Sequence, residues 1–189
     1  ESGQCKKFIA ISQMVKNDIL KHYRCPQENI SVVYNGVNLK RFHPGNENRQ
    51  SIRKELGITE STVLILFVGS GFERKGLKHL LQATQYLRSE DWRLVIMGKG
   101  KWNKYLQFAP KNLRSQIIHK DPVPEIEKYY SAADLFALPS IYEPFGNANL
   151  EALATGLPVI TTRHCGAADI IQHKLNGLIV ENPESPKEI

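Results

Sequence analysis

Two glutamates of this sequence have a type and spacing suited to binding a sugar. Seven residues separate Glu143 from Glu151. Apolar patterning predicts a strand over residues 134–138 and a helix over residues 146–155, so Glu143 lies in the loop between them and Glu151 inside the helix. A carboxylate accepts two hydrogen bonds at once, which suits neighbouring sugar hydroxyls. The alternative is an ordinary loop residue and an ordinary surface residue, although Glu151 lies on a largely apolar helix.

Two features near helix starts could bind a phosphate. The first amides of the helix, on Gly146, Asn147 and Ala148, have no partners within the helix and can face an anion. A glycine-rich loop over residues 69–76 follows another buried strand, and its Arg74 and Lys75 oppose the helix dipole there. The loop is neither a Walker loop nor a GxGxxG motif. A tight turn with solvated charges is an equally weighted alternative.

Strands and helices alternate along almost the whole chain. We expect strands at residues 8–11, 30–34, 62–68, 92–97, 116–119, 134–138, 158–162 and 177–180, and helices at 12–23, 46–56, 77–87, 101–109, 124–132 and 146–155. This alternation predicts an α/β, Rossmann-like domain whose mainly parallel sheet carries helices on both faces. Ligands of such sheets bind in loops at the carboxyl ends of strands, where both candidate segments lie.

Composition excludes several classes of protein. The 189 residues are 41% hydrophobic and 23% charged, which is ordinary for a globular domain. The net charge of +6 suits an anionic ligand or surface. No apolar run approaches the ~18 residues of a membrane-spanning helix. No two of the three cysteines, Cys5, Cys25 and Cys165, form a CxxC pair, which disfavours a zinc site or a disulfide framework. Their small number favours a reducing, cytoplasmic setting.

A family resemblance rests on several motifs in a fixed order. Glu143, Glu151 and the following Ala-x-Ala-x-Gly-Leu-Pro-Val-Ile resemble the retaining glycosyltransferases of family four, in the GT-B fold class. The segment Val-Tyr-Asn-Gly-Val-Asn at residues 33–38, Phe-Val-Gly at 67–69 and Tyr-Ser-Ala-Ala-Asp at 130–134 agree with it. The resemblance covers residues 5–183 and implies the donor-binding half of such an enzyme.

The resemblance also implies roles for particular residues. Glu151 would bind the ribose of a nucleotide sugar and Glu143 the transferred sugar. Backbone amides of Phe145, Gly146, Asn147 and Ala148 would contact the sugar and the diphosphate. The loop with Gly69 and Ser70 would approach the phosphates, Arg74 and Lys75 would stabilise the leaving diphosphate, and the base would lie near His119 and Asp121. No metal or other cofactor is expected, because the five aspartates form no DxD pair.

One departure from the family pattern concerns the donor. The family usually has an arginine at the position of Ser70, whereas here Arg74 directly precedes Lys75. This arrangement resembles the glucosyltransferases that add the first glucose to a heptose of the lipopolysaccharide core. UDP-glucose is therefore the expected donor.

The resemblance predicts two parts of unequal size. Residues 1–23 would be the end of an N-terminal acceptor domain or a linker, and residues 24–189 a nucleotide-sugar-binding domain cut at its C-terminus. The acceptor domain would be missing, so we expect the fragment to bind donor without transferring the sugar. None of the six histidines matches the catalytic histidine of that missing domain, and each is expected to be an ordinary surface or packed residue.

Two other functions stay open. One is a transferase or epimerase of the same fold that uses a different nucleotide sugar. The other is a non-enzymatic module that binds anions such as nucleic acid, which is disfavoured because the basic residues are spread out and few aromatics lie among them. The charge also suits contact with the anionic inner face of a bacterial inner membrane, as a peripheral cytoplasmic protein.

Overall fold

The strands predicted between residues 62 and 180 form one parallel sheet. The computed structural model describes residues 7–45, 47–89 and 91–189. The six strands are β3 (Val63–Val68), β4 (Trp92–Met97), β5 (Ile117–Lys120), β6 (Leu135–Leu138), β7 (Val159–Thr162) and β8 (Gly177–Val180). They lie in the order β5-β4-β3-β6-β7-β8, and every neighbouring pair is parallel. The prediction of a mainly parallel, Rossmann-like sheet is confirmed.

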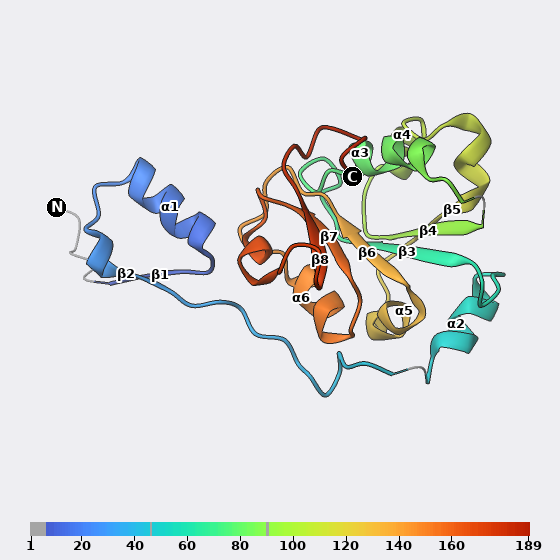
Figure 1. Ribbon diagram of the computed structural model, residues 1–189, viewed down its shortest axis with the longest axis horizontal. Helices are drawn as coiled ribbons and strands as arrows, with labels where there is room; N and C mark the ends of the chain where they lie inside the picture. Colours follow the sequence, from blue (N-terminus) through green and yellow to red (C-terminus); the bar gives the residue numbers. More distant parts are fainter. Residues whose placement is uncertain (1–6, 46, 90) are drawn as a thin grey trace.

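Helices cover both faces of this sheet, as predicted. They are α2 (Arg49–Glu55), α3 (Leu77–Ala83), α4 (Trp102–Leu106), α5 (Ile126–Ala132) and α6 (Asn147–Ala154), with short 3-10 helices η2 (Thr84–Tyr86), η3 (Lys111–Gln116) and η4 (Gly166–Ile170). Helices α3 and α4 lie on one face, and α2, α5 and α6 lie on the other (Figure 1). The four middle residues of β3 are buried, as expected for a strand covered on both sides.

The strand order creates a topological switch point beside β3. The chain builds outward from β3 to β4 and β5, and then returns to the other side of β3 for β6. The loops that follow β3 and β6 therefore leave the sheet in opposite directions and open a crevice between them. Ligands of open α/β sheets bind in such a crevice.

Several helices are shorter than predicted, among them α4, which spans Trp102–Leu106 where 101–109 was expected. The helix predicted to reach residue 87 ends at Ala83 and continues as the 3-10 turn η2, where the Thr84 hydroxyl donates to the Leu81 carbonyl over 2.7 Å. Such a bond competes with the helical pattern and tightens the last turn. Helix α2 begins at Arg49, and the predicted start at Asn46 lies outside the described residues, as does Cys5.

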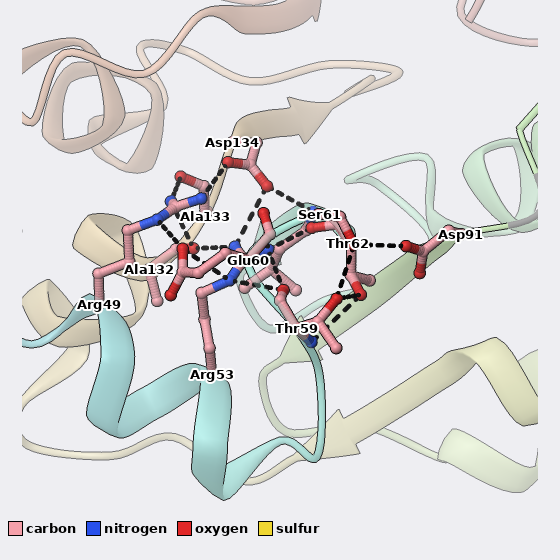
Figure 2. Close-up of polar contacts among 11 residues, drawn as sticks. Arg49, Arg53, Thr59, Glu60, Ser61, Thr62, Asp91, Ala132, Ala133 and Asp134 are labelled. Carbon is pink, nitrogen blue, oxygen red and sulfur yellow. Dashed lines mark hydrogen bonds and ion pairs between the residues drawn. The ribbon is translucent and has the colours of Figure 1, made fainter.

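Helix α2 is tied to the sheet through a buried cluster of charges (Figure 2). The side chain of Arg53 is only 2% exposed and forms an ion pair with Asp134 at 3.2 Å. Arg49 approaches the other oxygen of Asp134 at 2.7 Å. The remaining donors of Arg53 bind the carbonyls of Thr59, Glu60, Thr62 and Ala132. We call Arg49, Arg53 and Asp134 the α2 cluster.

A smaller unit precedes this domain. Strand β1 (Phe8–Ala10) pairs in parallel with β2 (Ile30–Val32), and α1 (Gln13–His22) and the 3-10 helix η1 (Gln27–Asn29) connect them. Ser12 caps α1, because its hydroxyl accepts from the Val15 amide over 3.1 Å. The partner strand of β1 thus lies beyond residue 23, and the division of the chain into domains stays a prediction.

Candidate functional site

A pocket lies at the switch point, between the carboxyl ends of β3 and β6. Its volume is about 420 Å³. It is lined by Ile11, Asn35, Val68, Gly69, Lys75, Glu143, Pro144, Phe145, Gly146, Asn147, Ala148 and Glu151. We call it the β3–β6 pocket. It brings together eight of the twelve site residues predicted from sequence.

The loop after β6 places Glu143 just before the start of α6. Its amide donates to the His164 carbonyl and its carbonyl accepts from the Gly166 amide, each over 2.9 Å. The Ala167 amide donates to the Phe145 carbonyl over 2.8 Å. These bonds attach the loop to the segment after β7, so the position of the carboxylate is fixed by the backbone.

Two cations share the carboxylate of Glu143. The Lys75 ammonium and the Arg74 guanidinium each lie 2.8 Å from its Oε2 atom. Burial raises the pKa of Glu143, but the hydrogen bonds and charges of Lys75 and Arg74 outweigh burial and lower the pKa below its ordinary value. Arg74 also donates to the Tyr142 carbonyl over 3.1 Å. These three side chains carry one negative and two positive charges, and Glu151 adds a second carboxylate to the lining of the pocket.

Glycines allow the two loops to approach this closely. A Cβ atom on Gly69 would lie 2.4 Å from the Cδ of Lys75. Gly76 has a φ of +70°, and a Cβ atom there would lie 1.9 Å from the Pro139 carbonyl oxygen. A side chain at Gly76 is therefore excluded by both conformation and space. The glycine-rich loop thus packs directly on the loop after β6.

The first turn of α6 faces the same pocket. Gly146 is its N-cap with a φ of +85°, and no side chain of the described residues caps this end. Asn147 and Ala148 line the pocket beside it. Uncapped amides at the start of a helix attract an anion, and the helix dipole adds to that attraction.

Glu151 lies one turn further along α6 and has a different environment. The hydroxyl of Tyr130, which is fully buried, donates to its Oε2 atom over 2.9 Å. Burial raises the pKa of Glu151, while the Tyr130 hydrogen bond and the charge of Arg41 partly oppose that rise. Burial, with Glu151 nearby, also raises the pKa of Tyr130 well above its ordinary value. The second oxygen of Glu151 remains available to accept from a ligand hydroxyl.

The N-terminal unit contributes residues that the sequence did not reveal. Ile11 and Asn35 line the pocket, and Asn35 Nδ2 donates to Asn147 Oδ1 over 2.7 Å. The Ser12 hydroxyl donates to the Pro144 carbonyl, also over 2.7 Å. These contacts join residues more than 110 positions apart in the sequence. Local patterning carries no signal for them, because they depend on how the unit docks.

Four predicted site residues lie outside the pocket. Arg74 reaches Glu143 from its rim, and Ser70 accepts from the Lys99 amide over 3.0 Å. His119, at the end of β5, stacks on Trp102 with ring centroids 4.9 Å apart, and its Nε2 lies 3.0 Å from the Gly98 carbonyl oxygen. Asp121 is exposed. The Trp102 partner of His119 was also missed, although an aromatic residue four positions after Gly98 was visible in the sequence.

The described residues offer neither a metal site nor a membrane-spanning helix. They contain no cluster of three or more His, Cys, Asp or Glu residues that could hold a metal ion. Within the same residues, every helix is too short or too polar to cross a bilayer.

The fold and the pocket define a class of protein before any comparison is made. A parallel α/β sheet with an anion-attracting pocket at its switch point is a Rossmann-like, nucleotide-binding type of domain. The sequence matches the family described as glycosyl transferases group 1 over residues 48–189, and glycosyltransferase family 4 over residues 2–41. The chain belongs to the group 1 glycosyl transferases, and its fold is one half of a GT-B enzyme. The resemblance inferred from the motifs is confirmed.

Individual relatives agree with this assignment. An uncharacterized glycosyltransferase of Methanocaldococcus jannaschii, MJ1607, is 33% identical over 95% of this chain and 48% of its own length. Lipopolysaccharide glucosyltransferase WaaG of Escherichia coli is 29% identical over all of this chain and 52% of its own. The chain therefore spans about half the length of the curated relatives it matches.

Solved structures show the same architecture. A crystal structure of WaaG, a glycosyltransferase involved in lipopolysaccharide biosynthesis, superposes with a TM-score of 0.84 and 30% identity over all of this chain and 52% of that one. Anabaena Alr3699/HepE in complex with UDP-glucose gives a TM-score of 0.84 over 97% of this chain and 51% of that one. Its identity is 22%, so that likeness shows the fold alone.

Proposed function

We propose that this chain is the donor-binding half of a retaining glycosyltransferase and that its donor is UDP-glucose. The observation that carries the proposal is the β3–β6 pocket, where Lys75, Glu143, the start of α6 and Glu151 line one cavity. Cations and helix amides suit a diphosphate, and carboxylates suit sugar hydroxyls. Membership of the glycosyl transferase family and similarity to the glucosyltransferase WaaG support a nucleotide sugar as donor.

Each part of the pocket has a role in this proposal. Glu151 accepts from the ribose hydroxyls, and Glu143 accepts from the transferred hexose. Backbone amides of residues 145–148 contact the sugar and the diphosphate. When the bond between the sugar and the diphosphate breaks, negative charge develops on the departing diphosphate. Lys75 and Arg74 stabilise that charge, as preorganised cations do in other active sites.

We propose that these cations make a metal unnecessary. They would stand where the transferring group develops charge, and the sequence offers no DxD pair for a divalent ion. The uracil would extend toward the end of β5, near His119 and Asp121. The stacked rings of His119 and Trp102 offer a flat apolar surface in that direction.

The acceptor belongs to the part of the enzyme that this chain does not contain. Because the chain spans about half of its relatives, we propose that it binds donor but transfers nothing alone. The name of the E. coli relative, lipopolysaccharide glucosyltransferase, supports lipopolysaccharide as the acceptor, and we propose that the accepting sugar is a heptose of its core. The full enzyme would then work as a peripheral protein on the cytoplasmic face of the inner membrane.

Calorimetric titration tests the donor. The chain is titrated with UDP, UDP-glucose, GDP-mannose and ADP-glucose, each with and without EDTA. We expect the uridine ligands to bind most tightly, EDTA to change nothing, and Glu151→Ala and Arg74→Ala/Lys75→Ala to weaken binding. Lys21→Ala/Lys54→Ala removes two exposed lysines of α1 and α2 and serves as the matched control.

Each other outcome points to a different function. Preference for GDP-mannose or ADP-glucose would replace UDP-glucose with another donor. Conversion of UDP-glucose to another UDP-hexose would indicate an epimerase. Binding without preference for base or sugar, with a steep dependence on salt, would indicate a simple anion-binding module. Detectable sugar transfer by the chain alone would contradict the proposal that it is inactive.

A further inference from the structure

A second hollow lies between the loop after β3 and the segment after β4. Its volume is about 450 Å³. It is lined by Gly71, Phe72, Glu73, Arg74, Lys99, Gly100, Lys101, Lys104 and Tyr105. It shares no lining residue with the β3–β6 pocket, although Arg74 stands between the two. We call it the basic groove.

The segment that forms one wall of this groove is rich in basic residues. The chain has 25 Lys and Arg against 19 Asp and Glu. Residues 92–120 contain seven of the basic residues and none of the acidic ones, which leaves 18 against 19 elsewhere. Basic residues occur along the whole chain, as expected, and this segment differs in having no acidic residues to balance them. Three of its seven basic residues, Lys99, Lys101 and Lys104, line the groove.

Three lysines of this segment present free charges to the groove. Lys99, Lys101 and Lys104 are exposed, and none of them forms an ion pair with a carboxylate of the described residues. Arg74 adds a fourth cation, and Glu73 is the single carboxylate in the lining. Cations gathered in a concave site repel one another unless an anion lies among them.

The walls of the groove are held in place without those lysine side chains. A Cβ atom on Gly100 would lie 2.4 Å from the Cε2 of Phe72, so the two loops pack in direct contact. The Lys99 amide donates to the Ser70 hydroxyl over 3.0 Å. Phe72 is 3% exposed and packs edge-to-face against Tyr105 at 5.3 Å. The lysines therefore project from a fixed frame, and replacing them removes charge without removing packing.

We infer that the basic groove is a second anion site, which binds a ligand carrying two or more phosphate groups. Four cations around one cavity exceed what a single phosphate needs, and a clustered set of phosphates would pair with all of them. The groove shares no lining residue with the β3–β6 pocket, but Arg74 borders both, and Phe72 of the groove packs against His119. The inference is therefore tested with a probe that has neither base nor sugar. The phosphates can belong to a soluble phosphorylated molecule or to the headgroups of lipids.

Inorganic tripolyphosphate is the probe for the soluble form. The whole chain is titrated by calorimetry at fixed salt. Lys101→Gln/Lys104→Gln should weaken binding at least fivefold. The control Lys21→Gln/Lys54→Gln removes the same charge from exposed positions elsewhere and should change affinity less than twofold. The same comparison in a Lys75→Ala background should keep the difference, because Lys75 lines only the β3–β6 pocket.

Vesicles distinguish a lipid source. Cosedimentation is measured with phosphatidylcholine alone and with one quarter phosphatidylglycerol. If Lys101→Gln/Lys104→Gln no longer cosediments with the anionic vesicles while the control still does, the phosphates that bind the groove are those of lipid headgroups. An effect limited to calorimetry would identify a soluble phosphorylated ligand. Circular dichroism checks that both double variants are folded.

Several results would overturn the inference. Equal losses in both double variants would mean that total charge attracts the probe. A loss caused by Lys75→Ala alone would place the probe in the β3–β6 pocket. Weak tripolyphosphate binding, together with tight binding of a 15-nucleotide dT oligomer that Lys101→Gln/Lys104→Gln abolishes, would make the groove a nucleic-acid site.

Discussion

Two clusters in this protein each place a carboxylate between two cations, and they differ in what surrounds those cations. In the α2 cluster, Asp134 lies between Arg49 and Arg53 (Figure 2). In the β3–β6 pocket, Glu143 lies between Arg74 and Lys75. Each carboxylate has two cations beside it and a lowered pKa, even though burial alone would raise it. In the α2 cluster both arginines also pair with the exposed Glu60, at 3.0 and 3.6 Å.

The difference lies in the remaining donors of the cations. Arg53 is 2% exposed and gives its other hydrogen bonds to four backbone carbonyls. Arg74 is 47% exposed, and the Lys75 ammonium has a single partner, Glu143, among the described residues. A charge whose donors are all used can only stabilise the fold. A charge with spare donors beside a cavity can also bind a ligand.

The largest effect should come from breaking the α2 cluster. Arg53→Met removes a donor from four carbonyls, of which Thr59 and Ala132 keep another, and removes one cation from Asp134. We therefore expect a loss of about 3–5 kcal/mol in the free energy of unfolding. Urea titration measures it. Arg88→Met, at an exposed arginine, is the control and should stay within about 0.5 kcal/mol of the parent. If Arg53→Met lost as little stability as Arg88→Met, the α2 cluster would not have the purely structural role that distinguishes it from the β3–β6 pocket.

The next effect should appear in binding. Lys75→Ala removes a charged partner of the proposed diphosphate, and a hydrogen bond to a charged group contributes about 1.5–3 kcal/mol, so UDP affinity should fall about 10- to 100-fold. Calorimetry measures the affinity, and Lys54→Ala is the matched control. The free energy of unfolding should change much less than in Arg53→Met. A large loss of stability with unchanged UDP affinity would make Lys75 a structural residue like Arg53.

The sequence predicted one side of this comparison better than the other. The loops after β3 and β6 were identified because strand ends and glycines can be read from local patterns, and the strand order then brought them together. Arg53 looked like an ordinary residue of a polar surface helix. Its burial depends on carbonyls up to 79 positions away, which no local pattern reveals. Asn35 was missed in the pocket for the same reason.

A smaller effect on the pH dependence of stability should distinguish Glu151 from Asp134 and Glu143, the two carboxylates whose pKa is lowered. Its pKa is raised above the ordinary 4.5 by burial, so its contribution to stability is complete below pH 4.5 and is lost as the pH rises through the raised value. The contributions of Asp134 and Glu143 to stability depend on pH in the opposite direction. They are complete above the ordinary pKa of each carboxyl group and are lost as the pH falls through the lowered pKa.

Replacing Glu151 with glutamine tests that sign. Glu151→Gln keeps an acceptor for the Tyr130 hydroxyl and cannot ionise, so its free energy of unfolding should rise relative to the parent above pH 4.5. Urea titrations from pH 4 to 7 measure the difference, with Glu188→Gln as the exposed control. A difference that grows toward low pH would mean that Glu151 is stabilised as an anion. UDP affinity should fall in the same variant if Glu151 binds the ribose.

The smallest effect tests whether an ion pair matters by itself. Arg163 and Glu181 are in contact, yet their side chains are 64% and 62% exposed. Water screens this pair, and holding two long side chains together costs entropy, so Arg163→Gln, Glu181→Gln and the double variant should be indistinguishable from the parent in urea titration. A measurable coupling between them would show that proximity of charges is enough. If no coupling is found, proximity of charges alone does not explain the stability lost in Arg53→Met or the UDP affinity lost in Lys75→Ala. Those losses would then come from the hydrogen-bond donors of each cation, which are all used in Arg53 and partly unused in Lys75.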